Sequence, residues 1–331
     1  MAITLAEMKV GMDDKIAEQV VDTFLRNSEI LQLLPFDNCV CPDGTGSTLT
    51  YGYVQTKIPS TAAFRTLNNE YTAAEATVEE KNVTLKIFGG SFEMDRVLKE
   101  AEGKYNSMAF QLEQKIKSAI SLFHYTLING DATTNAQEFD GLDKQLASTS
   151  TEYNASGCID ISTMSNLTTN ADALYEAIQI LVNNTNADAL LMNTAMLSKI
   201  QTLARKLGYR TETEEAFGKK VISMDGVKLI DLQKYYTVSS GTVTGNDCVK
   251  SGITRTISST STSGLTDIYA VRFDVNEGFH AATLTGNSVI QQYLPNFNEP
   301  GAVKKGEVEM VAATVLKNTS AAGVLRNIKI A

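Results

Sequence analysis

Residues 88–142 read FGGSFEMDRVLKEAEGKYNSMAFQLEQKIKSAISLFHYTLINGDATTNAQEFDGL, and most of this stretch follows the period of one long amphipathic helix. Its apolar residues recur every three or four positions, as a helix with one buried stripe requires. They are Met94, Leu98, Ala101, Tyr105, Met108, Leu112, Ile116, Ala119, Phe123 and Leu127. Because Gly103 costs about 1 kcal/mol relative to Ala inside a helix, the pattern predicts two pieces, about 93–102 and 105–129.

The predicted helix stops after Ile128, where the chain continues Asn129-Gly130-Asp131. Asn and Gly readily take the left-handed conformation that closes a helix. The following residues are polar until a second turn at 139–142. A helix of this length, ending in a defined stop, predicts the spine of a flat or elongated molecule.

Composition indicates a folded protein that neither spans a membrane nor reads a DNA sequence. The 331 residues are 43% hydrophobic, which is ample for a packed core. The net charge is −9 and the basic residues are scattered, so direct sequence-specific binding to nucleic acid is not expected. No apolar run reaches the ~20 residues of a membrane helix, and the N-terminus lacks a basic region followed by an apolar one, so a cytoplasmic protein is expected. The cysteines, Cys39, Cys41, Cys158 and Cys248, are expected to be reduced thiols.

The first part of the chain predicts an arm followed by a long hairpin. Residues 1–43 contain a short amphipathic helix that ends at Pro35, and such an arm either folds back on its own core or lies across a neighbour. Two alternating segments, 47–57 and 77–87, predict the strands of a hairpin whose connection is far longer than usual. Two such strands do not bury enough surface to stand alone, so something outside the hairpin must support them. The apolar residues near its tip that would dock are Ala62, Ala63, Phe64 and Leu67.

The section after the central helix predicts a small α/β unit. Residues 171–182 and 194–207 have helical periodicity, and Gly208 closes the second helix. Strands are expected at 189–192, 220–222 and 227–232, with Asp225-Gly226 as the turn between the last two. Residues 258–264 are almost all Ser and Thr and are expected to form a surface loop.

The last section is mostly strand, with candidates at 268–275, 278–284, 289–294, 307–316 and 324–330. We expect all of them to pair with the sheet that underlies the central helix. The fold class would then be α+β, a discontinuous domain with another domain inserted.

The sequence lacks the motifs that mark enzymes, metal sites and cofactor sites. It contains no phosphate-binding glycine loop, no dinucleotide fingerprint, no His-Glu-x-x-His and no Cys-x-x-Cys. His124, beside the apolar stripe, is interpreted as structural or interfacial, and His280 either packs in a strand or carries a proton. Asp131, Asp140 and Asp143 either bind a cation or, as their spacing favours, form turns and caps. We therefore expect no catalysis, no metal and no cofactor.

The order of the parts resembles the major capsid protein of tailed bacteriophages, the fold named after the Hong Kong phage and shared with encapsulin shells and herpesvirus capsid floors. The segments that carry this resemblance are ILQLLP at 30–35, FGGSFEMD at 88–95, LINGD at 127–131 with FDGL at 139–142, and IYAVRF at 268–273. They span nearly the whole chain, and their order and spacing are more specific than any one of them.

The resemblance implies a domain for each segment. Residues 1–43 would be the N-terminal arm and 44–87 the extended E-loop, with its tip residues on an adjacent subunit. Residues 88–149, completed by 291–331, would be the peripheral domain with the spine helix, and 150–290 the axial domain. Modest contacts repeated around a closed shell would then support the hairpin.

The resemblance also implies a function and a location. The chain would self-assemble as pentamers and hexamers into an icosahedral head in a virion, enclosing double-stranded DNA without sequence-specific binding, after assembly in the cytoplasm of a host bacterium. Its partners would be a separate scaffolding protein, a portal and decoration proteins. Two alternatives stay open at this point: an encapsulin-like shell around a cargo enzyme, and an enzyme whose site carries no known motif.

Overall fold

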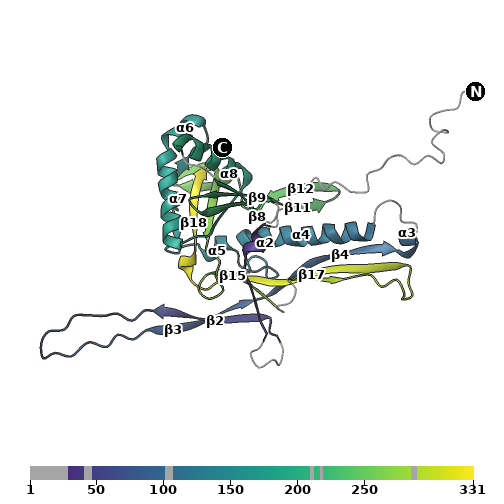
Figure 1. Cartoon of the computed structure of the whole chain (residues 1–331), viewed down its shortest axis with the longest axis horizontal. Helices are drawn as coiled ribbons and strands as arrows, with labels where there is room; N and C mark the ends of the chain where they lie inside the picture. Colours follow the sequence, from purple (N-terminus) through teal and green to yellow (C-terminus); the bar gives the residue numbers. More distant parts are fainter. Residues whose placement is uncertain (1–28, 41–46, 101–106, 209–211, 217–218, 285–288) are drawn as a thin grey trace, which may run out of the picture.

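The structure, a computed structural model, describes residues 29–40, 47–100, 107–208, 212–216, 219–284 and 289–331. The described chain is elongated (Figure 1). A block of helices and sheet lies at its centre, and the long helix α4 (Ser107–Asn129) extends from it in one direction. The hairpin of β2 (Thr50–Ile58) and β3 (Thr77–Thr84) extends in the opposite direction.

The central helix starts later than the sequence pattern predicts. Residues 86–95 form strand β4 (Lys86–Asp95), so Met94 lies in a strand, and the short helix α3 (Arg96–Glu100) follows it. The reason is alternation: Phe92 and Met94 are buried whereas Glu93 between them is exposed, which is the period of a strand with one covered face. Tyr105 and the predicted break at Gly103 lie outside the described residues.

A five-stranded sheet underlies α4. Its path is β1-β15-β17-β16, and β4 pairs with β17 from the other side. The strands other than β4 are β1 (Phe36–Asn38), β15 (Phe279–Thr283), β16 (Ile290–Tyr293) and β17 (Val303–Leu316). Helix α4 contacts β4 and β17, the two strands that form the long ribbon beneath it.

A nine-stranded sheet forms the centre of the block, with the path β5-β18-β14-β7-β10-β9-β8 and with β13 and β6 paired to β14 and β18. Its strands are β5 (Glu152–Tyr153), β6 (Ile159–Asp160), β7 (Ala189–Met192), β8 (Glu212–Ala216), β9 (Lys219–Met224), β10 (Val227–Asp231), β13 (Ile253–Ile257), β14 (Thr260–Val271) and β18 (Ala322–Lys329). The helices of this unit are α6 (Met164–Thr169), α7 (Ala171–Thr185) and α8 (Thr194–Leu207).

Most elements predicted for the α/β section are confirmed. Helices α7 and α8 and strands β7, β9 and β10 lie where the periodicity placed them. Gly208 closes α8 with φ of 77°, a left-handed conformation that glycine adopts without steric cost. Asp225 and Gly226 have φ of 53° and 82°, as the two-residue turn of a tight hairpin requires.

The expectation that all the last strands join the sheet under α4 is wrong for β14 and β18. These two strands pair with each other in the nine-stranded sheet, and β14 also pairs with β7. Conversely, β15, within the predicted 150–290 unit, pairs with β17 in the five-stranded sheet. Nearly every residue of β18 is buried, which only a central strand with both faces covered permits.

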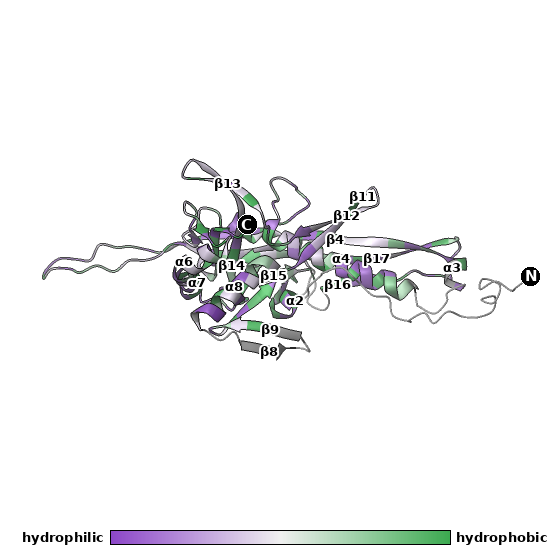
Figure 2. Ribbon diagram, turned by 90° about the horizontal axis from the view of Figure 1, so that it is seen from above, coloured by the Kyte–Doolittle hydropathy of each residue, from purple (hydrophilic) through white to green (hydrophobic). Residues whose placement is uncertain are grey.

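The Ser/Thr-rich segment predicted as a loop forms the hairpin of β13 and β14 instead. Its turn is Ser258-Ser259, with φ of 47° and 68°. A further hairpin, β11 (Lys234–Ser239) with β12 (Thr242–Asp247), turns at Ser240-Gly241 with φ of 49° and 80°. Threonine is β-branched and fits a pleated strand, so low hydrophobicity alone does not mark a loop. These hairpins project from the block in different directions (Figure 2).

The spine helix also ends differently from the prediction, because neither Asn129 nor Gly130 has a positive φ. Glycine is needed at 130 for space: a Cβ there would collide with the Phe139 carbonyl oxygen and the Thr126 side chain. The Gly141 amide donates to the Gly130 carbonyl at 2.8 Å, so the returning chain packs directly on the helix end. The short helix α5 (Leu142–Gln145) then begins.

The two sheets share one hydrophobic core. That core contains Leu127 of α4, Met310 of β17 and Leu142 of α5 together with Tyr269 and Val324 of the nine-stranded sheet. A second core lies between the nine-stranded sheet and its helices, with Leu174 and Ile200 among its members. The described helices include none that is both long and apolar enough to cross a membrane.

Candidate assembly interface

The hairpin β2–β3 extends from the body with most of its residues exposed. Its antiparallel ladder runs from Thr50 opposite Thr84 to Ile58 opposite Thr77, which confirms the predicted pairing. The second strand is shorter than predicted, because Leu85 is buried and β4 starts directly after it. Residues 59–76, hereafter the tip, connect the strands and point away from the rest of the molecule (Figure 1).

One face of β2 fastens the root of the hairpin to the five-stranded sheet. Tyr51 donates from its hydroxyl to Asp37 Oδ2 at 2.6 Å, and Tyr53 donates to the Leu316 carbonyl at 3.1 Å. Gln55 Nε2 donates to the carbonyl of Lys317 at 3.0 Å. Alternate strand residues share a face, so these three side chains line one side of β2 and fix the direction in which the hairpin leaves the body.

The opposite face of the hairpin is solvated along its whole length. Val54 and Val78 lie diagonally across one face and are 68% and 66% exposed. On the face of Tyr53 and Gln55, Lys81 Nζ lies 3.2 Å from Glu79, and hydrogen bonding from Lys81 lowers the pKa of that carboxyl. Surface ion pairs of this kind contribute little to stability, so the root hydrogen bonds of Tyr51, Tyr53 and Gln55 are the main attachment of the hairpin.

The predicted tip residues are all exposed. Ala62 and Ala63 lie open to solvent, Phe64 is fully exposed at 107%, and Leu67 is 87% exposed. Large apolar side chains in such an extended segment indicate a surface that another molecule covers.

The tip nevertheless contains local structure. The Asn69 amide donates to the Thr66 carbonyl at 3.2 Å, with Asn68 between them at a φ of 67°. The Arg65 guanidinium lies 5.4 Å from the centre of the Tyr71 ring and donates to the Asn69 carbonyl at 3.3 Å. The turn therefore gives the backbone around Leu67 a defined conformation.

The apolar stripe of α4 becomes more buried towards its C-terminus. Met108, Leu112 and Ile116 are half-buried, whereas Phe123 and Leu127 are fully buried. Phe123 is the centre of an aromatic cluster, with ring centres 6.3, 6.1 and 5.8 Å from those of Phe36, Phe88 and Phe139. The C-terminal half of the helix thus anchors it, and its N-terminal half lies along the β4–β17 ribbon.

Neither histidine has the surroundings of an acid–base catalyst. His124 and His280 are both completely buried. Burial lowers the pKa of His124 to about 3. Burial and then the charge of Lys317 lower the pKa of His280 to about 4. Both imidazoles are therefore neutral at pH 7 and pack as parts of the core.

The aspartates after the spine helix bind a lysine. Lys144 Nζ lies 2.6 Å from Asp131 Oδ1, 2.8 Å from Asp140 Oδ1 and 2.6 Å from Thr133 Oγ1. The hydrogen bond from Lys144 is the main cause of a pKa of Asp131 well below its usual range. An ammonium group thus occupies the place that a metal ion would need. Among the described residues no group of three or more His, Cys, Asp or Glu side chains is arranged to hold a metal.

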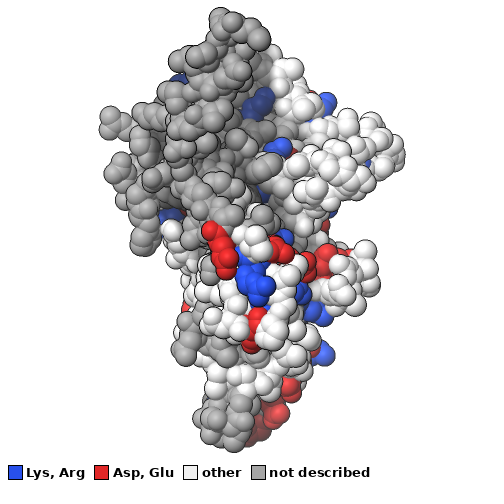
Figure 3. Space-filling model, turned by 90° about the vertical axis from the view of Figure 1, so that its right-hand side faces the viewer, with Lys and Arg blue, Asp and Glu red and all other residues white. Residues whose placement is uncertain are grey.

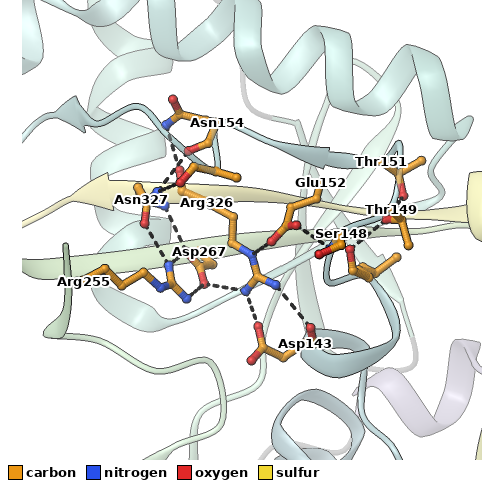
Figure 4. Close-up of polar contacts among 12 residues, drawn as sticks. Asp143, Ser148, Thr149, Thr151, Glu152, Asn154, Arg255, Asp267, Arg326 and Asn327 are labelled. Atoms are coloured by element: carbon orange, nitrogen blue, oxygen red, sulfur yellow. Dashed lines mark hydrogen bonds and ion pairs between the residues drawn. The ribbon is translucent and has the colours of Figure 1, made fainter. Parts of the chain in front are cut away.

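A partly buried ion-pair cluster that no sequence motif indicates joins α5 to the nine-stranded sheet (Figure 4). Arg326 on β18 donates to Glu152 at 2.8 Å, to Asp267 at 3.1 Å and to Asp143. Arg255 binds both oxygens of Asp267 at 2.6 Å. Burial opposes ionisation of Asp143, but the charge and hydrogen bond of Arg326, together with the hydrogen bond from Tyr269 and the charge of Arg255, outweigh it, so the pKa of Asp143 lies below its ordinary value.

The cluster is structural, because its charges are satisfied within the chain. Asp267 accepts a further hydrogen bond from the Asn327 amide at 3.0 Å, and Tyr269 donates to Asp143 at 2.9 Å. Its members come from α5, β5, β13, β14 and β18, so the cluster fixes the end of the spine against the nine-stranded sheet. This rigid connection suits a molecule whose hairpin and helix must point in fixed directions.

Charge on the surface is mixed. On the end of the molecule seen in Figure 3, the described basic side chains lie among acidic ones and not in a continuous basic patch. Proteins that track a phosphate backbone gather Lys and Arg on one face. The described residues at this end of the molecule therefore lack the pattern of a nucleic-acid groove.

This chain resembles known proteins in structure but not in sequence. No family model matches this sequence, and no curated protein matches it. The SrpI encapsulin of Synechococcus elongatus PCC 7942 superposes with a TM-score of 0.65 at 13% identity, over 100% of this chain and 97% of that one.

Two capsid structures match over equally long stretches. The capsid of a native GTA particle has a TM-score of 0.63 at 10% identity, over 99% of each chain. The capsid of Myoviridae phage XM1 has a TM-score of 0.54 at 12% identity, also over 99% of each chain. At such identities the likeness concerns the fold, and it extends over the hairpin, the helix and both sheets.

Proposed function

We propose that this chain, which has the Hong Kong phage-type capsid fold, is the major capsid protein of a tailed bacteriophage. Its subunits self-assemble as pentamers and hexamers into an icosahedral head that encloses double-stranded DNA. The observation that carries this proposal is the hairpin β2–β3, which leaves Phe64 and Leu67 exposed where no described part of the chain can cover them. A neighbouring subunit would supply the missing contacts.

The parts of the fold take the following roles in this proposal. The hairpin is the E-loop, and residues 1–43 are the N-terminal arm. Helix α4 with the five-stranded sheet is the peripheral domain, and the nine-stranded sheet with α6, α7 and α8 is the axial domain. Strand pairing supports drawing these domains by sheet, with β15 in the peripheral one and β18 in the axial one, in place of continuous ranges.

The charge of the chain supports the enclosure of DNA without sequence-specific binding. A net charge of −9 repels the phosphate backbone, and small cations neutralise packaged DNA. The shell is assembled in the bacterial cytoplasm with a separate scaffolding protein, joined by a portal and by decoration proteins, and becomes part of the virion. The subunit acts as a structural protein and not as an enzyme.

The second candidate is an encapsulin-like shell around a cargo enzyme, favoured by the likeness to the SrpI encapsulin over the whole chain. Both candidates use the same shell-forming contacts and differ in what the shell encloses. Particles treated with nuclease and then opened would release protected DNA for a phage head. A single co-purifying enzyme in place of DNA would favour the encapsulin.

Deletion of the tip segment 61–72 tests the role of the hairpin. Because this segment is exposed and contributes nothing to either core, we expect the variant to fold but not to assemble. Circular dichroism and thermal unfolding measure folding, and light scattering measures assembly. If the variant unfolds, the segment belongs to a core within the chain, and if it assembles normally, the hairpin does not hold the shell.

A further inference from the structure

A hollow of about 360 Å³ lies at the root of the hairpin, between β3, the loop 131–140 and the end of β17. Its apolar wall consists of Tyr53 and Val83 from the hairpin, Phe139 from the loop and Leu316 from β17. Protein sites for small apolar groups have volumes of roughly 300–1,000 Å³, so the hollow accommodates one or two large side chains.

The mouth of this hollow carries positive charge. Lys81 and Lys86 line it; Lys81 Nζ lies 3.2 Å from Glu79, and Lys86 also donates to the Ala136 carbonyl at 2.8 Å. Asp140 is the acidic residue in its lining, and that carboxylate is already bound by Lys144 at 2.8 Å. An incoming segment that is apolar in its centre and acidic at its side would therefore complement the hollow.

The tip of the hairpin has this chemistry. Phe64 and Leu67 are its exposed apolar side chains, and Glu70 and Glu75 follow them in the same exposed segment. Arg65, the basic residue of the tip, is held over Tyr71 and does not extend beside Phe64 as a free charge.

The tip cannot enter the hollow of its own chain. The ladder from Tyr53 to Ile58 carries the chain about 17 Å away from the hollow at ~3.3 Å per residue. The tip then continues in the same outward direction (Figure 1). The hydrogen bonds of Tyr51, Tyr53 and Gln55 to the body fix that direction. The occupant must come from another molecule.

We propose that the hollow receives Phe64 of a second copy of this chain, with Leu67 against the apolar wall and the acidic side of the tip near Lys81 and Lys86. The inference rests on the proposed shell function and names the receiving surface within it. Tip and hollow are different surfaces, so the contact is head-to-tail. Such contacts close into rings when the rotation between subunits allows it, which is what pentamers and hexamers require.

A photo-crosslinker tests this contact directly. Phe64 is replaced by benzoylphenylalanine, and particles are assembled from a mixture of ¹⁴N- and ¹⁵N-labelled subunits, irradiated and digested. We expect mixed-isotope crosslinks from position 64 to peptides containing 81–86, 132–140 or 314–319. Particles whose crosslinks map elsewhere would overturn the inference and leave the shell function standing. A protein that forms no particles under any condition would overturn both.

A substitution in the hollow gives an independent measurement. Thr84 lines the hollow and is exposed, so Thr84→Phe adds a large side chain at its wall without disturbing a core. We expect at least a tenfold loss of assembled protein at fixed concentration, whereas Thr84→Ser, which leaves the hollow open, assembles normally. Both variants are first shown to fold by circular dichroism. Equal assembly of the two would contradict the inference.

Discussion

Arg326 is the residue whose loss should destabilise the subunit most clearly. Its side chain is 7% exposed and that of its partner Asp267 is 2% exposed. Removing one member of a buried ion pair leaves an uncompensated charge, which costs about 3 kcal/mol or more. We expect Arg326→Met to lower the free energy of unfolding by about that amount, as measured by denaturant titration of unassembled protein.

A double-mutant cycle shows whether the two residues act together. Arg326→Met combined with Asp267→Asn should cost at least about 1 kcal/mol less than the sum of the single changes. Arg205→Met, on the exposed surface of α8, serves as the control and should change stability by less than about 0.5 kcal/mol. Strict additivity of the two buried changes would show that the cluster does not act as a unit.

His124 makes the folded subunit sensitive to mild acid. Its folded pKa of about 3 lies below the unfolded value of about 6.5. Above pH 6.5 both states are neutral, and as pH falls below 6.5 the unfolded state gains a proton that the folded state does not. Stability is therefore full above pH 6.5 and decreases towards pH 3, by up to about 1.4 kcal/mol per pH unit for this residue.

The variant His124→Leu isolates this effect. Between pH 6.5 and 5, before most carboxylates titrate, its free energy of unfolding should fall about half as steeply as that of the wild type. The remaining slope comes from His280, whose folded pKa is also lowered, to about 4. Identical slopes for variant and wild type would mean that His124 is solvated in the folded state.

At the scale of residues, the sequence predicts the role of a single side chain better than it predicts which other side chains that residue contacts. The helical stripe is enough to interpret His124 as structural or interfacial, and the structure places it in the core. The ion-pair cluster was not predictable, because Arg326 is 59 residues from Asp267 and 183 from Asp143 along the chain. Likewise, the spacing of Asp131 and Asp140 favours turn residues. That Lys144 binds both carboxylates can be seen only in the folded loop.

At the scale of elements, the hydrogen bonds at the hairpin root set the direction of β2 and β3. Tyr53→Phe removes the bond to the Leu316 carbonyl and should cost about 1 kcal/mol, confined to the hairpin. Hydrogen exchange should then speed up several-fold in β2 and β3 and stay unchanged in β18.

Tyr293→Phe is the matched control for this change. Its hydroxyl contacts Gln291 within the same exposed strand, so its removal should leave exchange in the hairpin unaltered. If Tyr53→Phe also leaves the hairpin unaltered, the root is held by other contacts.

The sequence predicts elements that carry a strong local pattern, such as helical periodicity followed by a stop residue. It does not predict which strands pair when they are far apart in the sequence. Helices α7 and α8 carry their own periodicity and stop signals. The pairing of β14 with β18 depends on residues far apart, so the terminal strands were assigned to the wrong sheet. The turn Ser258-Ser259 lacks the Gly or Asn that usually marks a tight hairpin, and the strands beside it are polar.

At the scale of the whole molecule, net charge should control assembly. Subunits of charge −9 repel one another, and salt shortens the range of that repulsion from about 10 Å at 0.1 M to about 3 Å at 1 M. We therefore expect the critical concentration for assembly, measured by light scattering, to fall several-fold as salt rises from about 0.05 to 0.5 M. A critical concentration that rises with salt would indicate that ion pairs, and not apolar contacts such as that of Phe64, hold the subunits together.

The central claim is that the chain forms a closed shell, and electron microscopy of the purified protein with its mass in solution tests it most directly. The protein is examined alone and co-expressed with the proteins encoded beside it, so that any scaffold is supplied. We predict closed particles of uniform size built from five- and six-membered rings. A protein that stays monomeric under every assembly condition, scaffold included, would contradict the claim.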